Sequence, residues 1–280
     1  MLETLGHYRL LEPLRSDLLG EAFRARDTLH GRTVAVRVVG DHIASDADKR
    51  AQLVSAARSA SALSHPGIAA LYEVAEDGGR LFVACEYVAG ERLQQVIAGG
   101  ALHPRRAVAC AAQVADALAE AHAHGIFHGA LGPDQIVLTP KGTAKLLDVG
   151  LSRWTAESEC GSAADDLRSL GATLLQMITG KTPAAGPHGG VASLRNVALP
   201  SGFERIMTGL IGTGQSSYQS AAVLAADLRE VAATLDAKSA AQLPQVTPTA
   251  SERRSPSAWL LIALVIGLAA ALAGWAIWGR

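Results

Sequence analysis

The stretch from His122 to Gly150 constrains the fold of this chain most strongly, because signals for a helix end, a loop and two strands follow one another within it. Gly125 follows an apolar-periodic helix at the position where a left-handed C-terminal cap is favoured. A polar loop from His128 to Gln135 comes next. Two short apolar runs, Ile136–Leu138 and Ala144–Leu147, then flank a Pro-Lys-Gly turn, a pattern that predicts a hairpin.

This stretch resembles the catalytic loop and metal-binding motif of the protein kinase family, and it is most similar to bacterial membrane-anchored Ser/Thr kinases. The family pattern is H-R-D-L-x-x-x-x-N followed by D-F-G. Here the first motif reads His128-Gly129-Ala130-Leu131 and then Gln135, and the second reads Asp148-Val149-Gly150. The resemblance covers Tyr8–Leu235 and implies an α+β, two-lobed kinase-like fold, with a five-stranded small lobe and a mainly helical large lobe.

Several residues that carry chemistry in the family are replaced in this loop. By the resemblance, Ala130 stands at the catalytic base, so no competent catalytic residue is expected there, and Gly132 stands at a phosphate-contacting lysine. Asp148 remains at a Mg²⁺-binding position, and Gln135 stands at the second metal-binding position with a longer side chain. His128 is kept, and the resemblance implies a structural role in bracing the backbone.

The small lobe departs from the family in a similar way. Arg15, Asp17 and Gly20 occupy the three glycine positions of the phosphate-binding loop, so an ordinary hairpin turn competes with a phosphate cradle as the interpretation of Arg15–Gly20. Arg37 occupies the position of the phosphate-binding lysine, a change that is not conservative in geometry. Ala56 occupies the position of the helix glutamate that pairs with this lysine.

The nucleotide pocket is better preserved than the catalytic loop. The segment Glu86–Val88 resembles the hinge that meets an adenine edge, with Ala35 above, Val137 below and Cys85 behind. Apolar residues at these positions equally suit a hydrophobic core, so purine binding remains one of two interpretations. The resemblance implies a residual nucleotide site at Gly20, Ala35, Arg37, Glu86, Val88 and Val137.

The segment that presents protein substrates in the family is short in this chain. Only Leu151 to Asp165 separate Gly150 from a D-x-x-S-L-G motif at Asp166–Gly171, and no A-P-E occurs. Ser217 also replaces the arginine that pairs with the glutamate of A-P-E in the family. The loss of both partners avoids a buried unpaired charge and favours a stable, edited fold.

Patterning predicts the remaining elements and the domain boundaries. We expect a small lobe over about 1–88 and a large lobe over about 89–236, followed by a flexible linker at 237–257 that is rich in Pro, Ser, Thr and Gln. The predicted strands are Tyr8–Leu14, Glu21–Ala25, Arg32–Val39, Ile68–Val74 and Arg80–Glu86. The predicted helices are Asp48–Leu63, Pro104–His124, Asp166–Gly180, Phe203–Leu210 and Ala221–Leu235.

Charge and cysteine content exclude several classes of function. The formal net charge is −1, so no basic field for nucleic acid is expected. Three cysteines at wide spacing disfavour a disulfide framework and suit a reducing cytosol. His122, His124 and His128 lie close in sequence, but they lack a familiar metal-ligand spacing.

The C-terminal segment predicts a membrane anchor. Ala258–Trp278 carries no charged residue and is long enough to cross a bilayer, with tryptophans near both ends. Arg253 and Arg254 precede it, which favours a cytoplasmic location for the kinase-like domain of a single-pass cell-membrane protein. A buried core helix is the alternative interpretation. Small residues at Ala263, Gly267, Ala271 and Gly274 suggest a homodimer seam, although plain Ala-rich composition would also give them.

These expectations combine into a membrane-tethered Ser/Thr-kinase-like protein that is catalytically inactive, a pseudokinase acting in signalling by binding proteins. Its predicted partners are other proteins, such as an active kinase or a membrane complex, and the lipid bilayer through 258–278. No cofactor is required by this interpretation. The alternatives are a nucleotide-binding sensor that takes ATP with or without Mg²⁺ but transfers no phosphoryl group, and an active Ser/Thr kinase with atypical motifs.

Overall fold

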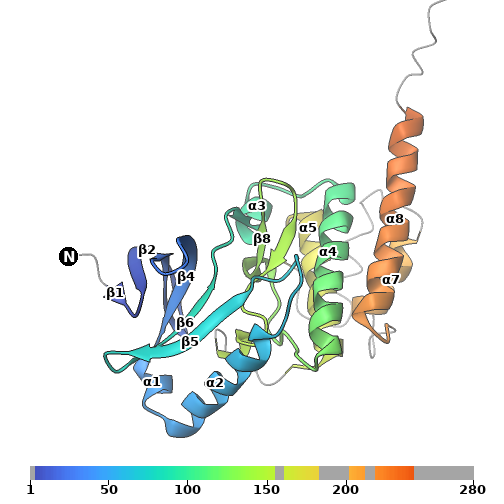
Figure 1. Cartoon of the computed structure of the whole chain (residues 1–280). Coiled ribbons are helices and arrows are strands. Elements are labelled where there is room, and N and C mark those ends of the chain that lie inside the picture. The colour runs from blue at the N-terminus through green and yellow to red at the C-terminus, as the bar shows by residue number, and fades with distance from the viewer. Residues whose placement is uncertain (1–3, 155–160, 183–201, 212–217, 243–280) are drawn as a thin grey trace, which may run out of the picture. The chain divides into compact units, whose positions relative to one another are not determined.

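A computed structural model of the chain describes residues 4–154, 161–182, 202–211 and 218–242. The chain divides into two units, residues 1–237 and 238–280. The description below concerns the first unit, which contains a sheet with two helices followed by a mainly helical region (Figure 1).

The N-terminal half is built on a six-stranded antiparallel sheet with the strand order β1-β2-β3-β4-β6-β5. Helix α2 packs against β5, and Asp46 caps its N-terminus by accepting hydrogen bonds from two backbone N–H groups. The strands are β1 (Thr4–Leu5), β2 (Tyr8–Asp17), β3 (Gly20–Asp27), β4 (Arg32–Val39), β5 (Leu71–Asp77) and β6 (Arg80–Glu86), and the helices are α1 (Asp41–Ala44) and α2 (Ala47–Ser61).

The prediction of five strands in this lobe was therefore wrong by one. Strand β1 adds a sixth, pairing Thr4 with Arg9 and Leu5 with Tyr8. Two residues are too few for a period-two pattern to be detected in the sequence. Leu5 and Tyr8 are nonetheless fully packed, with 0% and 2% of their surface exposed, and they share a core cluster with Phe82.

The first hairpin is tighter than predicted. Strand β2 runs to Asp17 and β3 starts at Gly20, so the turn consists of Leu18 and Leu19 rather than Arg15–Gly20. Asp17 accepts a hydrogen bond from the Leu19 backbone N–H at 3.0 Å. Leu18 is 44% exposed, whereas Leu19 is 0% exposed and packs in the core beneath the sheet with Val39 and Leu53.

The C-terminal half is mainly helical, with a small three-stranded sheet of order β7-β8-β9. The long helix α4 lies at its centre, with the sheet on one side and other helices on the other (Figure 1). The elements are β7 (Glu91–Arg92), α3 (Leu93–Ala98), α4 (Pro104–Ala123), η1 (Pro133–Gln135), β8 (Ile136–Leu138), β9 (Ala144–Leu146), η2 (Ser152–Trp154), α5 (Ala163–Thr179), α7 (Phe203–Ile211) and α8 (Ala221–Gln242).

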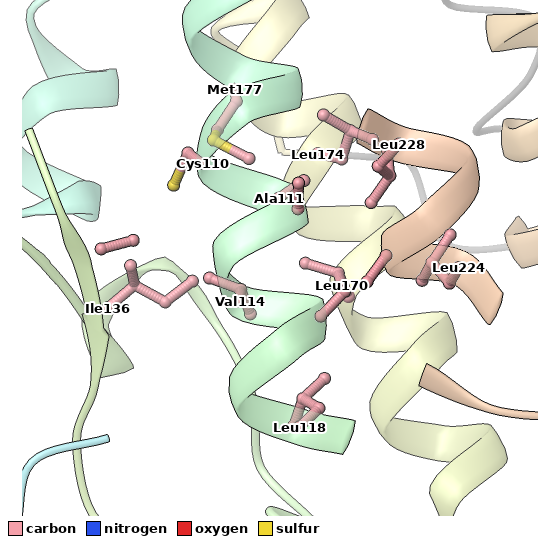
Figure 2. Packing of buried hydrophobic residues seen from close by; sticks show 14 of the residues in the cluster. Cys110, Ala111, Val114, Leu118, Ile136, Leu170, Leu174, Met177, Leu224 and Leu228 are labelled. Atoms are coloured by element: carbon pink, nitrogen blue, oxygen red, sulfur yellow. The ribbon is translucent and has the colours of Figure 1, made fainter. Parts of the chain in front are cut away.

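Apolar faces of α4, α5 and α8 meet in one core cluster. Figure 2 shows Val114 of α4 on the side of Ile136 in β8, and Leu170 of α5 between α4 and the α8 residues Leu224 and Leu228. These side chains are almost completely buried. The predicted helices therefore lie close to their predicted positions, because the 3.6-residue apolar period on each records the face that packs here.

Two predictions concern the C-terminal region. Helix α8 continues to Gln242, so the helix extends past its predicted end at Leu235 and into the segment 237–257 that was predicted to be a linker. Within the part of the chain that the structure describes, no helix is both long and apolar enough to cross a membrane. The predicted span 258–278 lies outside the described residues.

Candidate functional site

A cavity of about 200 Å³ lies between the small-lobe sheet and the hairpin of β8 and β9. Its apolar wall includes Leu14, Ala22, Ala35, Leu71, Val88 and Val137. Its charged wall contains Arg15, Arg37 and Arg92, together with Glu86 and Asp148. The cavity thus combines a slot for a flat apolar group with a cluster of guanidinium groups.

The structure brings most of the predicted nucleotide-site residues to this cavity. Ala35, Arg37, Glu86, Val88 and Val137 all contribute to its wall, as does Asp148. The two remaining predicted residues, Gly20 and Gln135, are not among the wall residues within the described chain.

Gly20 and Gln135 have structural surroundings of their own. A Cβ atom on Gly20 would lie 2.0 Å from the Val38 carbonyl oxygen, so the glycine is required by the close approach of β3 to β4. Gln135 is 5% exposed, and its side-chain oxygen has no hydrogen-bond partner among the described residues.

Asp148 is engaged by two arginines of the small lobe. Arg15 forms an ion pair with its Oδ2 atom, and Arg37 Nη2 lies 3.5 Å from the same oxygen. Asp17 completes the cluster, with its Oδ2 atom 3.3 Å from both Arg15 Nε and Arg37 Nη2. The four side chains are only 9% to 18% exposed, and their two positive and two negative charges balance.

The state of Asp148 follows from this setting. Burial alone would raise the pKa of its carboxyl group, but the positive charges of Arg37 and Arg15 outweigh burial, and the pKa lies below its ordinary value. Asp148 also has a backbone φ of 55°, in the left-handed region that is uncommon for residues other than glycine. Because its pKa is low, the Asp148 carboxylate is ionised, and the guanidinium groups of Arg15 and Arg37 neutralise its negative charge.

Sequence reasoning did not find the pair between Arg15 and Asp148. The two residues are separated by 133 positions, and no local pattern links them. The replacement of the helix glutamate by Ala56 was the available signal, because it left the positive charge of Arg37 without its expected partner. The structure supplies Asp17 and Asp148 in place of that glutamate.

The loop around Ala130 is held by a buried carboxylate from α5. Asp166 is 1% exposed and accepts hydrogen bonds of 2.8 Å from the backbone N–H groups of His128 and Gly129. His122 Nε2 lies 2.8 Å from the same carboxylate. His128 in turn hydrogen-bonds to the Leu147 carbonyl oxygen at 3.2 Å, and burial lowers the pKa of its imidazole.

Histidines gather at two places in the described part of the chain. His122, His124 and His128 bond to three different partners, with His124 Nδ1 2.9 Å from the Glu120 carbonyl oxygen. They therefore do not converge on one point.

The ligand atoms of His7, Asp27 and His30 do lie within 4.8 Å of one another. Here, however, Asp27 already accepts two backbone N–H groups of its turn and pairs with Arg32 Nε at 3.1 Å. This carboxylate organises the turn between β3 and β4.

On the hinge side of the cavity, the side chain of Glu86 is also held by contacts within the protein. Glu86 pairs with Lys145 Nζ at 2.6 and 2.7 Å, and it accepts a hydrogen bond from the Ala70 backbone N–H at 3.2 Å. Cys85 lies on the cavity wall, where burial raises the pKa of its thiol to about 12. The Cys85 thiol therefore stays protonated near neutral pH.

Comparison with known proteins agrees with this architecture. A family model described as the protein kinase domain matches residues 16–165. The chain is 28% identical over 204 residues to the serine/threonine-protein kinase PrkC of Bacillus subtilis, covering 65% of this chain and 32% of that protein. It is 29% identical over 223 residues to PknA of Mycobacterium tuberculosis, covering 70% of this chain and 52% of that protein. The chain thus spans about half or less of the length of these relatives.

Solved structures show the same fold. The kinase domain of Mycobacterium tuberculosis PknI superposes with a TM-score of 0.69 at 22% identity, covering 82% of this chain and 98% of that one. On the strength of the family match over more than half of its residues, the chain belongs to the protein kinase domain family.

Proposed function

We propose that this chain is a pseudokinase, a protein-kinase domain that transfers no phosphoryl group and acts in signalling by binding other proteins. The observation that carries the proposal is the state of Asp148. Its carboxylate, the one retained at a metal-binding position, is paired with Arg15 and Arg37. A Mg²⁺ ion would have to displace both guanidinium groups before it could bind a nucleotide phosphate.

The residues replaced at catalytic positions of the family also argue against phosphoryl transfer. A lost general base is typically worth about 10² to 10⁴ in rate, and loss of electrostatic stabilisation of the transferring group costs more. Ala130 removes the first contribution, while Gly132 and Ala56 remove parts of the second. Such losses are not additive, but each of them acts against phosphoryl transfer.

The proposed partners are proteins, such as an active kinase or a membrane complex. The support is the short segment between Gly150 and α5, which lacks the A-P-E motif of the family's platform for substrates. A single membrane span at 258–278 would hold the domain at the cytoplasmic face, and it could also pair two copies. With a net charge of −1, nucleic acid is not a proposed partner.

Incorporation of label from γ-labelled ATP tests the loss of phosphoryl transfer. The purified full chain, with Mg²⁺ or Mn²⁺ and a generic protein substrate, is expected to give no incorporation above that of the Asp148→Ala variant. Incorporation by the wild-type chain that Asp148→Ala abolishes would overturn the proposal and favour an active kinase with atypical motifs.

A nucleotide-binding sensor is the second candidate, and the cavity favours it. About 200 Å³ of space lined by Ala35, Val88 and Val137 can take a flat ring. A thermal-shift titration with ATP tests this candidate. A ligand at about 100 times its Kd adds roughly 2.7 kcal/mol of stability, so the absence of any shift at millimolar ATP would remove it.

A further inference from the structure

The wall of the cavity holds three arginines beside two carboxylates. Arg15, Arg37 and Arg92 face it, against the carboxylates of Glu86 and Asp148. Glu86 is already neutralised by Lys145 at 2.6 Å. Asp148 and Asp17 are shared between Arg15 and Arg37, so a ligand anion would bind these arginines by taking the place of an internal carboxylate.

The guanidinium group of Arg37 has a hydrogen-bond donor that a ligand could satisfy. The residue is 7% exposed and lines the cavity. Its Nη2 atom makes two long contacts, 3.3 Å to Asp17 and 3.5 Å to Asp148. Its Nη1 atom is buried and has no hydrogen-bond partner among the described residues. A buried donor without a partner is unfavourable, so an acceptor placed here by a ligand would be stabilised.

Arg15 can join the same ligand. It lies near the end of β2, and at 18% exposed it is the most accessible of the four clustered side chains. A guanidinium group presents a planar fork of donors that matches the oxygens of a phosphate or carboxylate. Arg15 and Arg37 together could hold such a group, provided that Asp148 releases them.

We infer that Asp148 is an internal counter-anion that competes with the ligand for Arg15 and Arg37, and that the cavity binds a flat-ring anion without a divalent cation. This inference rests on the proposed function, because it requires that Asp148 does not serve as a metal ligand. The ligand class is a planar apolar ring bearing a phosphate or carboxylate. The ring occupies the slot between Ala35 and Val137, and the anion lies against the arginines.

The two modes of binding predict opposite changes in nucleotide affinity when Asp148 is replaced by asparagine. In a metal-dependent site Asp148→Asn removes a metal ligand and weakens nucleotide binding. In the arginine site the same change frees Arg15 and Arg37 and strengthens it. The probe is ADP, measured by calorimetry on the full chain in EDTA and again in Mg²⁺.

We expect ADP to bind the wild-type chain in EDTA, and Asp148→Asn to tighten that binding by at least about tenfold. Arg37→Gln should weaken it by a similar factor. Arg26→Gln, which removes the same charge from an exposed position on β3, is the matched control and should leave the affinity unchanged. Asp17→Asn should also tighten ADP binding, as Asp148→Asn does, because Asp17 pairs with both arginines.

Binding that requires Mg²⁺ and is lost in Asp148→Asn would overturn the inference, as would failure of ADP to bind any of the folded variants. Thermal unfolding of each variant identifies those that are folded. The labelled-phosphate assay separates the two proposals. If ADP does not bind in EDTA and the labelled-phosphate assay shows no transfer, only the arginine site is overturned. If the assay shows transfer, the pseudokinase assignment itself is overturned.

Discussion

At the scale of single residues, two buried carboxylates hold backbone segments of the molecule in place. Asp27 and Asp166 are buried and accept backbone N–H groups, whereas the family resemblance places Ala130 and Ala56 at positions where active kinases carry acidic residues. The clearest predictions at this scale concern the two carboxylates that remain.

Asp166 should be one of the most sensitive positions of the large lobe. Asp166→Ala leaves the buried N–H groups of His128 and Gly129 without their acceptor, and we expect a loss of about 3 kcal/mol in the free energy of unfolding. Urea denaturation measures it. The neighbouring Asp165 caps α5 at an exposed position, so Asp165→Ala should cost about 1 kcal/mol. Equal effects of the two changes would contradict the role given to Asp166.

The Asp27 turn should make stability depend on acid. Burial opposes ionisation, but hydrogen bonds from His30 and Arg32 prevail and lower the pKa of Asp27 to about 2. A carboxyl group with a depressed pKa contributes stability above its unfolded pKa of about 4, and this contribution is lost as the pH falls towards 2.

The expected result is that Asp27→Asn flattens the decline of the melting temperature between about pH 5 and pH 2. Thermal unfolding across that range is the measurement, and the exposed Asp41→Asn change serves as control. Parallel curves for wild type and Asp27→Asn would show that the turn carboxylate is not a source of acid sensitivity.

At the scale of elements, the first hairpin differs most from what its counterpart in an active kinase must do. A phosphate-binding loop presents bare backbone to the nucleotide, whereas this turn inserts Leu19 into the core under the sheet. The two leucines of the turn therefore provide an internal comparison.

Leu19→Ala should cost about 2 to 5 kcal/mol, as expected for the truncation of a fully buried leucine. Leu18→Ala, one position away and 44% exposed, should change stability by less than about 0.5 kcal/mol. Chemical denaturation of both variants tests the difference. A tolerant Leu19 would mean that the hairpin tip is not anchored in the core.

The elements also show what a sequence can and cannot reveal. The strands Arg32–Val39 and Arg80–Glu86 were predicted with their observed bounds, because apolar and β-branched residues mark them locally. Strand β1 was not predicted because two residues are too few to show the alternation of apolar and polar residues that marks a strand. The contact between Arg15 and Asp148 was missed because it joins positions 133 apart. Local patterns identify the elements, but the charge partners across the cavity depend on how distant elements pack.

At the scale of the whole molecule, the kinase-like domain and the C-terminal segment raise separate questions. The domain is described by its own core clusters. The apolar run at 258–278 is known from its sequence alone, and membrane attachment is part of the proposal.

Removal of residues 258–280 should transfer the protein from the membrane pellet to the supernatant. The physical reason is that an uncharged run of this length is stable across the hydrocarbon core of a bilayer. Fractionation before and after an alkaline carbonate wash, with the full chain as reference, is the measurement. A truncated chain that stays in the washed pellet would show that another part of the protein attaches to the membrane.

The anchoring of the catalytic loop by Asp166 has a consequence for how this protein relates to its active relatives. Because the backbone of the loop is fixed from α5, side chains at Ala130 and Gly132 can change without moving it. In evolutionary terms, if the proposed pseudokinase assignment is correct, a reversal at these two positions would restore functional groups to a loop that is still in position. The hairpin offers no such route, since its tip has become part of the core. For the proposed pseudokinase, regaining activity would thus need few changes on the catalytic-loop side of the cavity and many on the hairpin side.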